Sequence, residues 1–209
     1  MADAAPTPRP SSPHPRRPEE LYTSPPPWDI GRPQPALLAL AEAGSIRGRV
    51  LDAGCGTGEH TLMAARLGLD ATGVDLATSA LGIAVGKAEE RGLTARFLQH
   101  DVLHLARLVE TFDTVLDSLV FHGFSGDDRT AYVESLRTAT TPGGRLFVLS
   151  FRDEPPAPSG RPHRVTPDEI RTAFASGWQI DAIDAITVDT ALPSLPEGIR
   201  GWRTALTRI

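Results

Sequence analysis

From residue 35 onward, short apolar runs alternate with longer amphipathic segments. Runs of four to eight residues that are bounded by turn residues predict strands, whereas apolar residues three or four apart predict helices. The expected strands are 49–53, 71–75, 95–98, 111–116, 144–151, 178–188 and 201–209, and the expected helices are 36–43, 58–67, 79–91, 127–138 and one that begins at Thr166. Strands separated by helices indicate right-handed crossovers and an α/β fold with a mostly parallel sheet.

A parallel sheet of this kind binds ligands at the carboxyl ends of its strands. The site is therefore expected just after residues 53, 75, 98, 117 and 151.

Proline divides the N-terminal part of the chain from the rest. Eleven of the nineteen prolines lie between Pro6 and Pro35. A segment with few apolar residues and few backbone donors cannot offset the entropy of ordering, so we expect residues 1–20 to be a disordered tail. Residues 21–45 are then expected to form an N-terminal lid and helix, and residues 46–209 the main domain.

Composition narrows the possible functions. The chain has 209 residues, 40% of them hydrophobic and 22% charged, which suits one globular domain. Its net charge of -5 argues against a nucleic-acid partner, because phosphate binding needs clustered Lys and Arg.

Cys55 is the only cysteine, which excludes an internal disulfide and a multi-cysteine zinc site, and we expect no metal. No apolar run is long enough to span a bilayer, so we expect a cytoplasmic protein without a membrane partner.

The most informative motif is the sequence VLDAGCGTGEH at residues 50–60. Glycines at every second position after a buried strand allow a tight turn and a close approach of the backbone to a ligand. A phosphate-binding Walker loop needs a lysine that this motif lacks. In a dinucleotide fingerprint the third glycine falls at Glu59, whose carboxylate would repel a pyrophosphate. The turn therefore favours a cationic cofactor, with a nicotinamide-dependent oxidoreductase as an alternative.

The combination of Asp52, Gly54, Gly56 and Gly58 with Asp75 at the end of the next strand resembles motif I of class I S-adenosylmethionine-dependent methyltransferases. The resemblance extends over residues 28–209. It implies a Rossmann-like fold with a seven-stranded, mostly parallel sheet, an antiparallel last strand and helices on both faces. It also implies that S-adenosyl-L-methionine is bound and S-adenosyl-L-homocysteine is released.

The same resemblance implies roles for individual residues. The glycine turn surrounds the methionine part of the cofactor, Asp75 accepts hydrogen bonds from both ribose hydroxyls, Asp101 contacts the adenine, and Asp117 lies beside the methionine ammonium and the transferred methyl. The complete set expected to bind the cofactor is Trp28, Asp52, Gly54, Cys55, Gly56, Gly58, His60, Asp75, Leu76, Asp101, Val102 and Asp117. Asp52, Asp75 and Asp101 also have structural interpretations as turn or capping residues. Cys55 suits a packing residue better than a nucleophile.

Residues 25–35, with the sequence PPPWDIGRPQP, resemble the N-terminal segment of small-molecule methyltransferases related to thiopurine and tellurite methyltransferases. In such relatives the segment folds over the cofactor as a lid. Tyr22 and Trp28 are amphipathic rings that can exclude water from a filled site, and we expect both to contact the substrate. The alternative is that Trp28 only anchors the loop to the core.

The segment after the fourth expected strand reads DSLVFHGF. It lacks the proline pair typical of nucleic-acid amino methyltransferases, which argues against such substrates. Phe121, His122 and Arg152 are expected to contact the acceptor, with His122 and Asp117 as the catalytic residues. The ordinary pKa of histidine suits a general base at neutral pH, although a structural role for His122 is an equal alternative.

These observations predict an S-adenosylmethionine-dependent methyltransferase that moves a methyl group to an O, N or S atom of a small aromatic or heterocyclic molecule. The alternatives are a cofactor-binding regulator without turnover and the nicotinamide-dependent oxidoreductase. Either a monomer or a homodimer is expected.

Overall fold

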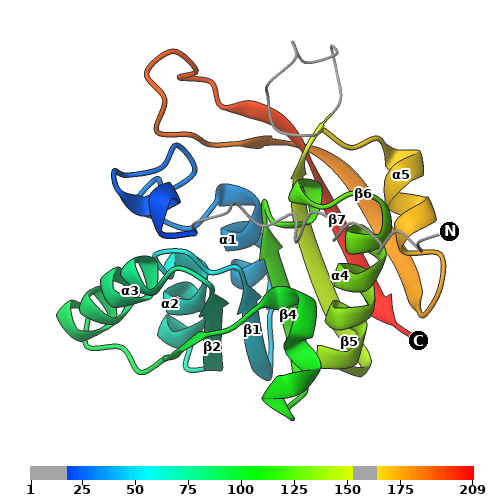
Figure 1. Cartoon of the computed structure of the whole chain (residues 1–209), viewed down its shortest axis with the longest axis horizontal. Coiled ribbons are helices and arrows are strands. Elements are labelled where there is room, and N and C mark those ends of the chain that lie inside the picture. Colours follow the sequence, from blue (N-terminus) through cyan, green and yellow to red (C-terminus); the bar gives the residue numbers. More distant parts are fainter. Residues whose placement is uncertain (1–17, 153–163) are drawn as a thin grey trace, which may run out of the picture.

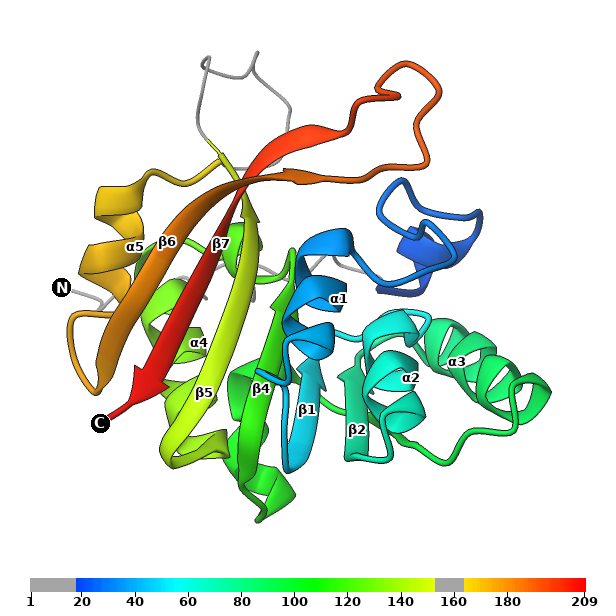
Figure 2. The ribbon, with the colours of Figure 1, turned by 180° about the vertical axis from the view of Figure 1, so that it is seen from behind.

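The computed structural model describes residues 18–152 and 164–209, and its centre is one seven-stranded sheet (Figures 1 and 2). The strand order is β3-β2-β1-β4-β5-β7-β6. The strands are β1 Arg49–Ala53, β2 Asp70–Asp75, β3 Arg96–Gln99, β4 Phe112–Ser118, β5 Thr140–Phe151, β6 Trp178–Val188 and β7 Ile199–Arg208. Strands β1 to β5 pair in parallel, and β7 runs antiparallel to both β5 and β6. The predicted parallel sheet with an antiparallel last strand is confirmed.

Helices cover both faces of this sheet, as predicted (Figures 1 and 2). The α-helices are α1 Pro35–Glu42, α2 Glu59–Arg66, α3 Thr78–Glu90, α4 Gly126–Ala139 and α5 Pro167–Ala173, and the 3-10 helices are η1 Pro18–Tyr22, η2 Val102–Leu108 and η3 Phe121–Gly123. Helices α1, α2 and α3 lie on one face, and η2, α4 and α5 lie on the other.

Each face of the sheet has its own apolar core. Buried residues of η2, α4 and α5 pack with strand residues in one cluster, and buried residues of α1 and α2 pack in the other. Because both faces of the central strands are covered, the burial of β1 and β4 does not alternate along the strand, and even the polar residues Asp52, Thr114 and Asp117 are buried.

The ordered body begins earlier in the chain than predicted. Residues 18–20 belong to η1 and not to a disordered tail, because Glu19 is hydrogen-bonded to the start of α3. The expectation for residues 1–17 lies outside the described residues. Strand β5 is also longer than predicted, since it begins at Thr140, directly after α4.

Candidate functional site

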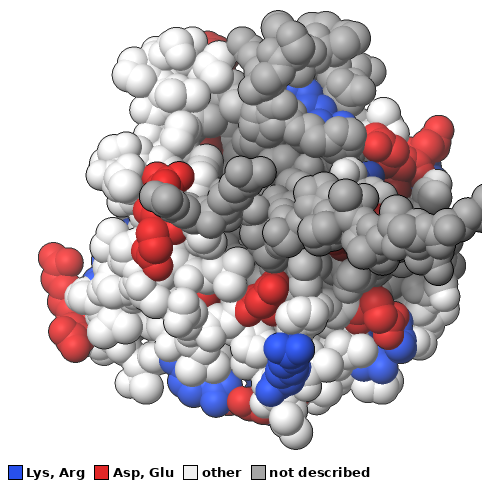
Figure 3. Space-filling view, viewed as in Figure 1, with Lys and Arg blue, Asp and Glu red and all other residues white. Residues whose placement is uncertain are grey.

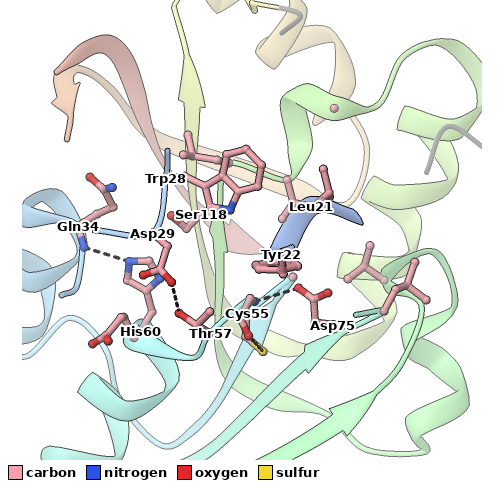
Figure 4. Close-up of a pocket in the computed structure, with 18 of the residues that line it drawn as sticks. Leu21, Tyr22, Trp28, Asp29, Gln34, Cys55, Thr57, His60, Asp75 and Ser118 are labelled. Carbon is pink, nitrogen blue, oxygen red and sulfur yellow. Dashed lines mark hydrogen bonds between the residues drawn. The ribbon is translucent and has the colours of Figure 1, made fainter. Parts of the chain in front are cut away.

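A cavity of about 390 Å³ lies at the carboxyl ends of the parallel strands, where the sequence predicts a ligand. Figure 4 shows side chains from the N-terminal segment, the glycine turn and the strand ends pointing into this space. The strand order divides the lining in two. We call the part formed by Asp75, Leu76, His100 and Val102 the β2–β3 half, and the part formed by Ser118, His122, Phe124 and Phe151 the β4–β5 half. The glycine turn after β1 lies between them.

The structure places many predicted site residues in the lining and leaves others out of it. Those that line the cavity are Tyr22, Trp28, Gly54, Cys55, Gly56, His60, Asp75, Leu76, Val102 and His122. Those that do not are Asp52, Gly58, Asp101, Asp117, Phe121 and Arg152.

The turn after β1 requires glycine for both conformation and space. Gly54, Gly56 and Gly58 all have positive φ values, of 75°, 53° and 86°. A Cβ on Gly54 would lie 2.4 Å from Val120 Cγ2, and one on Gly58 would lie 2.8 Å from Ala84 Cβ. Gly58 therefore packs the turn against α3 and does not itself face the cavity.

Asp75 connects this turn to β2. Its Oδ2 accepts a hydrogen bond from the Gly56 N–H at 2.9 Å, and its Oδ1 accepts one from the Ala77 N–H at 2.9 Å. Burial raises the pKa of the Asp75 carboxyl, although these backbone hydrogen bonds oppose the shift. The carboxylate thus faces the cavity from a fixed position.

Asp52 lies beneath the turn and not in the cavity. The side chain is 1% exposed, and Oδ2 accepts hydrogen bonds from the Thr61 N–H at 3.0 Å and the Thr61 hydroxyl at 2.8 Å. Burial raises the pKa of the Asp52 carboxyl. The predicted cofactor contact through the Asp52 side chain is therefore corrected to support of the turn and the start of α2.

His60 and its neighbour Glu59 are the α2 residues that line the cavity. The His60 Nε2 accepts a hydrogen bond from the Gln34 N–H at 3.1 Å, so the ring joins the lid to the turn (Figure 4). Burial lowers the pKa of His60 below the ordinary value, which favours the neutral ring.

The negative charge of Glu59, which was expected to repel a pyrophosphate, is neutralised by two neighbouring cations. Arg91 donates two hydrogen bonds to its carboxylate, at 2.8 and 2.9 Å, and Lys87 Nζ lies 2.9 Å from Oε1. Burial opposes the charge, but these cations outweigh it and lower the pKa of Glu59. Repulsion by Glu59 alone therefore does not select a cationic cofactor.

Cys55 is a packing residue, as expected. The side chain is 7% exposed, and burial raises the pKa of the thiol well above its ordinary value, which disfavours the thiolate. A Cβ on Gly73 would lie 2.8 Å from Cys55 Sγ, so β2 and the turn are tightly packed there.

Asp101 acts as a helix cap. The carboxylate accepts a hydrogen bond from the Leu103 N–H at 2.9 Å and caps η2. Its neighbours His100 and Val102 line the β2–β3 half instead. The contact of Asp101 with an adenine stays a prediction beside this capping role.

The lid residues Tyr22 and Trp28 face each other across the cavity mouth (Figure 4). Trp28 is 41% exposed. Trp28 is therefore not an anchor in the core. Below them, the Thr57 hydroxyl donates to Asp29 Oδ2 at 2.8 Å and accepts from Lys87 Nζ at 2.8 Å, which ties the lid to the glycine turn and to α3.

Asp117 shapes the loop that follows β4. Its carboxylate is fully buried and accepts hydrogen bonds from the Val120 and Phe121 N–H groups and from the Tyr132 hydroxyl at 2.9 Å. The side chain is turned into the core and away from the cavity. The predicted place of Asp117 beside the transferred methyl is therefore corrected to positioning of η3, which carries His122.

Phe121 and His122 point in different directions from η3. Phe121 is fully buried, with its ring centroid 5.2 Å from Phe174 and 5.1 Å from the Arg129 guanidinium, so it is a core residue. The ring of His122 lines the cavity, with its centroid 4.6 Å from that of Phe151. Phe151, rather than Phe121, is the aromatic partner in the site.

Asp117 is expected to make the stability of the protein depend on pH. Burial raises its pKa to about 7, and the three donors only partly oppose the shift. Between pH of about 4 and 7 the folded protein keeps a proton that the unfolded chain loses, so the free energy of unfolding falls by about 1.4 kcal/mol per pH unit from this group. The stabilisation is complete below that window and lost as pH rises through 7.

Urea unfolding at pH 5 and pH 7 measures this effect. Asp117→Asn removes the titrating group, so the decline between the two pH values should be smaller by about 2 kcal/mol than in the wild type. Asp127→Asn, an exposed change in α4, should leave the decline unchanged. Equal declines in wild type and Asp117→Asn would contradict the assignment.

Arg152 lies outside the cavity lining. Its guanidinium carbon is 4.6 Å from the centroid of the Trp202 ring. The guanidinium thus packs on β7, and contact of Arg152 with the acceptor stays a prediction.

Sequence reasoning missed these residues of the lining: Pro18, Leu21, Asp29, Ile30, Arg32, Gln34, Thr57, Glu59, His100, Ser118, Leu119, Val120, Gly123, Phe124 and Phe151. Four of them lie in the PPPWDIGRPQP motif. The motif predicted that this segment forms a lid but did not indicate which of its side chains face the cavity. Phe151 ends β5, a position that the sheet rule indicates.

Within residues 18–152 and 164–209, no group of His, Cys, Asp and Glu is arranged to hold a metal ion. No described helix is long and apolar enough to cross a membrane. On the face in Figure 3, described basic side chains stand in separate small groups near acidic ones.

Similarities to known proteins identify the family of this chain. A model of the methyltransferase domain matches residues 50–144. The 2-heptyl-1-hydroxyquinolin-4(1H)-one methyltransferase of Mycobacteroides abscessus is 40% identical over 169 residues, which cover 79% of this chain and 74% of the relative. A structure solved in work on conversion of a disulfide bond into a thioacetal group during echinomycin biosynthesis has a TM-score of 0.81 and 40% identity and covers 91% of both chains.

A third match concerns the fold alone. The structure of magnesium protoporphyrin IX methyltransferase from Synechocystis PCC 6803 with bound SAM has a TM-score of 0.64 and 23% identity, and the match covers 83% of this chain and 76% of that one.

Proposed function

This chain belongs to the class I S-adenosylmethionine-dependent methyltransferases, and we propose that it methylates an O, N or S atom of a small aromatic or heterocyclic molecule. The observation that carries the proposal is the β4–β5 half of the cavity. Phe124 and Phe151 provide aromatic surface there, and His122 provides the ionisable group. Trp28 adds a third ring at the mouth. Such a wall suits a flat, apolar acceptor that carries one acidic heteroatom.

The β2–β3 half and the glycine turn fit the cofactor. Asp75 presents a carboxylate, which suits the two adjacent hydroxyls of a ribose because one group can accept from both. Glycine at position 56 lets the lid close over the turn, because a Cβ on Gly56 would lie 2.9 Å from the Tyr22 hydroxyl. When bound, S-adenosylmethionine supplies a methyl group that is already activated by the sulfonium.

The protein's own contribution is alignment, exclusion of water and removal of a proton. Tyr22 and Trp28 close the mouth over the glycine turn. His122 accepts the proton of the acceptor heteroatom, and Asp117 holds the loop that carries His122 through its bonds to the Val120 and Phe121 N–H groups. Catalysis thus needs transfer of one proton from the acceptor to His122 and a cavity from which water is excluded.

The named relatives support a heterocyclic acceptor. The Mycobacteroides abscessus protein is named for a hydroxyquinolinone, which is a bicyclic heterocycle with a hydroxyl group. A probable thiol methyltransferase of Arabidopsis thaliana, 30% identical over 128 residues, supports sulfur as another acceptor atom. The family membership sets aside the nicotinamide-dependent oxidoreductase.

A panel of acceptors tests the proposal. Purified protein is incubated with methyl-labelled S-adenosylmethionine and with hydroxyquinolines, phenols, aromatic thiols, aliphatic thiols or a DNA oligonucleotide. We expect label in the aromatic and heterocyclic products. Transfer only to the aliphatic thiols or to DNA would overturn the proposed acceptor class. Cofactor binding without transfer to any compound would favour a regulator that lacks turnover.

A further inference from the structure

The carboxylate of Glu19 caps the start of α3 from a different part of the chain. Its oxygens accept hydrogen bonds from the Thr78 N–H at 2.7 Å, the Thr78 hydroxyl at 2.9 Å, the Ser79 N–H at 3.1 Å and the Ser79 hydroxyl. The helix has no side-chain cap of its own, since its N-cap residue is Ala77. Glu19 therefore pairs N–H groups that the helix start leaves free, at the positive end of the helix dipole.

The contact is strong enough to keep Glu19 ionised. Hydrogen bonds from Ser79 and then from Thr78 lower the pKa of the Glu19 carboxyl to about 2. The charge on Glu19, and with it the contact, is constant over the working pH range of an enzyme.

Glu19 holds a wall of the β2–β3 half in place. Pro18, Leu21 and Tyr22, all in η1, line the cavity. The Tyr22 hydroxyl lies over Gly56, and the charge of Asp75 contributes to the raised pKa of Tyr22, after burial. Displacing η1 from α3 would therefore uncover the part of the cavity where Asp75 and the glycine turn lie.

The other end of the lid, residues 18–34, is held differently. The Gln34 side chain is 2% exposed and makes two hydrogen bonds to the backbone of Asp189, from Nε2 to the carbonyl at 3.0 Å and from the Asp189 N–H to Oε1 at 3.0 Å. Arg32 pairs with Asp189 at 2.6 Å, and the Ala191 N–H donates to the Pro27 carbonyl at 2.8 Å. The loop between β6 and β7 lies beside the lid in both ribbon views (Figures 1 and 2).

The two ends differ in the cost of release. Breaking the Gln34 contact would leave buried amide and carbonyl groups without partners, which is expensive. Breaking the Glu19 contact exchanges exposed hydrogen bonds for bonds to water, which costs much less. Opening is therefore expected at η1, while the Gln34 end stays attached.

We propose that Glu19 is a positioning residue that holds η1 over the β2–β3 half, and that release of Glu19 from Thr78 and Ser79 is the step that lets the cofactor enter and the demethylated cofactor leave. The inference rests on the proposed function, because it assigns the cofactor to the β2–β3 half. It adds that the η1 end of the lid opens while the Gln34 end stays attached to Asp189.

Dissociation of S-adenosylhomocysteine tests this. Its rate is followed by stopped-flow tryptophan fluorescence, with S-adenosylmethionine as the competitor, for the wild type, Glu19→Ala, Glu19→Gln and the exposed control Glu89→Gln at the far end of α3. Glu19→Ala should speed dissociation and raise the KM for S-adenosylmethionine by roughly five- to tenfold, the scale on which a helix cap shifts an equilibrium. Glu19→Gln, which keeps one acceptor oxygen, should fall between, and Glu89→Gln should match the wild type.

The KM for the acceptor separates positioning from general damage to the fold. In both Glu19 variants it should change by less than about twofold, because Glu19 binds the start of α3 after β2 and the acceptor is assigned to the β4–β5 half on the other side of β1. An unchanged dissociation rate in Glu19→Ala, or equal rises in both KM values, would overturn the proposal. Failure of the wild type to bind S-adenosylhomocysteine would instead overturn the cofactor assignment. If Glu19→Ala does not fold, the comparison of Glu19→Gln with Glu89→Gln gives the same decision.

Discussion

Asp75→Ala should weaken the binding of S-adenosylmethionine by about 10- to 150-fold. The side chain presents a fixed carboxylate to the β2–β3 half, and loss of hydrogen bonds to a charged acceptor costs about 1.5 to 3 kcal/mol. The change also removes the acceptor of the Gly56 N–H, which loosens the glycine turn. Calorimetric titration of both proteins with S-adenosylmethionine measures the effect directly.

Asp70→Ala is the matched control for this experiment. Asp70 begins the same strand, is exposed and pairs with Arg49 at 3.4 Å, at the end of β2 that lies away from the cavity. Its loss changes the net charge by the same amount but should leave cofactor affinity within about twofold of the wild type. Equal affinities of Asp75→Ala and the wild type would remove Asp75 from the binding site.

His122→Ala should lower kcat by about 100-fold for acceptors that lose a proton during methylation, while the affinity for S-adenosylmethionine stays close to that of the wild type. The ring lines the β4–β5 half beside Phe151, on the other side of the glycine turn from Asp75. A general base contributes most when the acceptor is a weak acid, so the defect should shrink for acceptors that are already ionised at the assay pH. Steady-state rates with a series of substituted phenols of different pKa measure this dependence.

His104→Ala serves as the control, because His104 is exposed and lies outside the cavity lining. It should retain wild-type kcat for every acceptor in the series. A defect in His122→Ala that is the same for weak and strong acids would mean that His122 shapes the cavity and does not remove the proton. Wild-type rates throughout would exclude both roles.

The sequence was sufficient for the fold because its local signals agree with the tertiary structure. Local sequence preference and tertiary position agree in the buried strand 49–53 and in the glycine turn that follows it. They also agree at the start of α5, where Pro167 occupies the first turn of the helix. The parallel pairing of most strands follows from the crossover rule, and the antiparallel last strand follows from the family resemblance. The early start of β5 at Thr140 was missed because the segment TTPGG reads as a turn.

The site was predicted less completely, because spacing locates a residue on the sheet but does not give the direction of its side chain. Asp75 is the last residue of β2 and Asp117 is the second-last residue of β4, yet Asp75 faces the cavity, whereas Asp117 faces Tyr132 in the core. Phe121 and His122 are adjacent in η3, yet Phe121 is buried in the core and His122 lines the cavity. Their spacing in the sequence does not indicate this difference in direction. A 3-10 turn was not expected there, and it decides which ring reaches the cavity.

Contacts between distant segments were beyond the reach of sequence reasoning. Glu19 caps α3 from 59 residues away, and Gln34 binds the backbone of Asp189 from 155 residues away. Neither residue type carries a signal for such a partner, because each pairing exists only after the lid has folded onto the domain.

A crystal structure of the protein with S-adenosylhomocysteine tests the central claim most directly. The account predicts that the ribose hydroxyls lie within hydrogen-bond distance of the Asp75 carboxylate and that the sulfur faces the space beside His122. A ligand that leaves Asp75 without a sugar contact, or whose sulfur points away from the β4–β5 half, would contradict it.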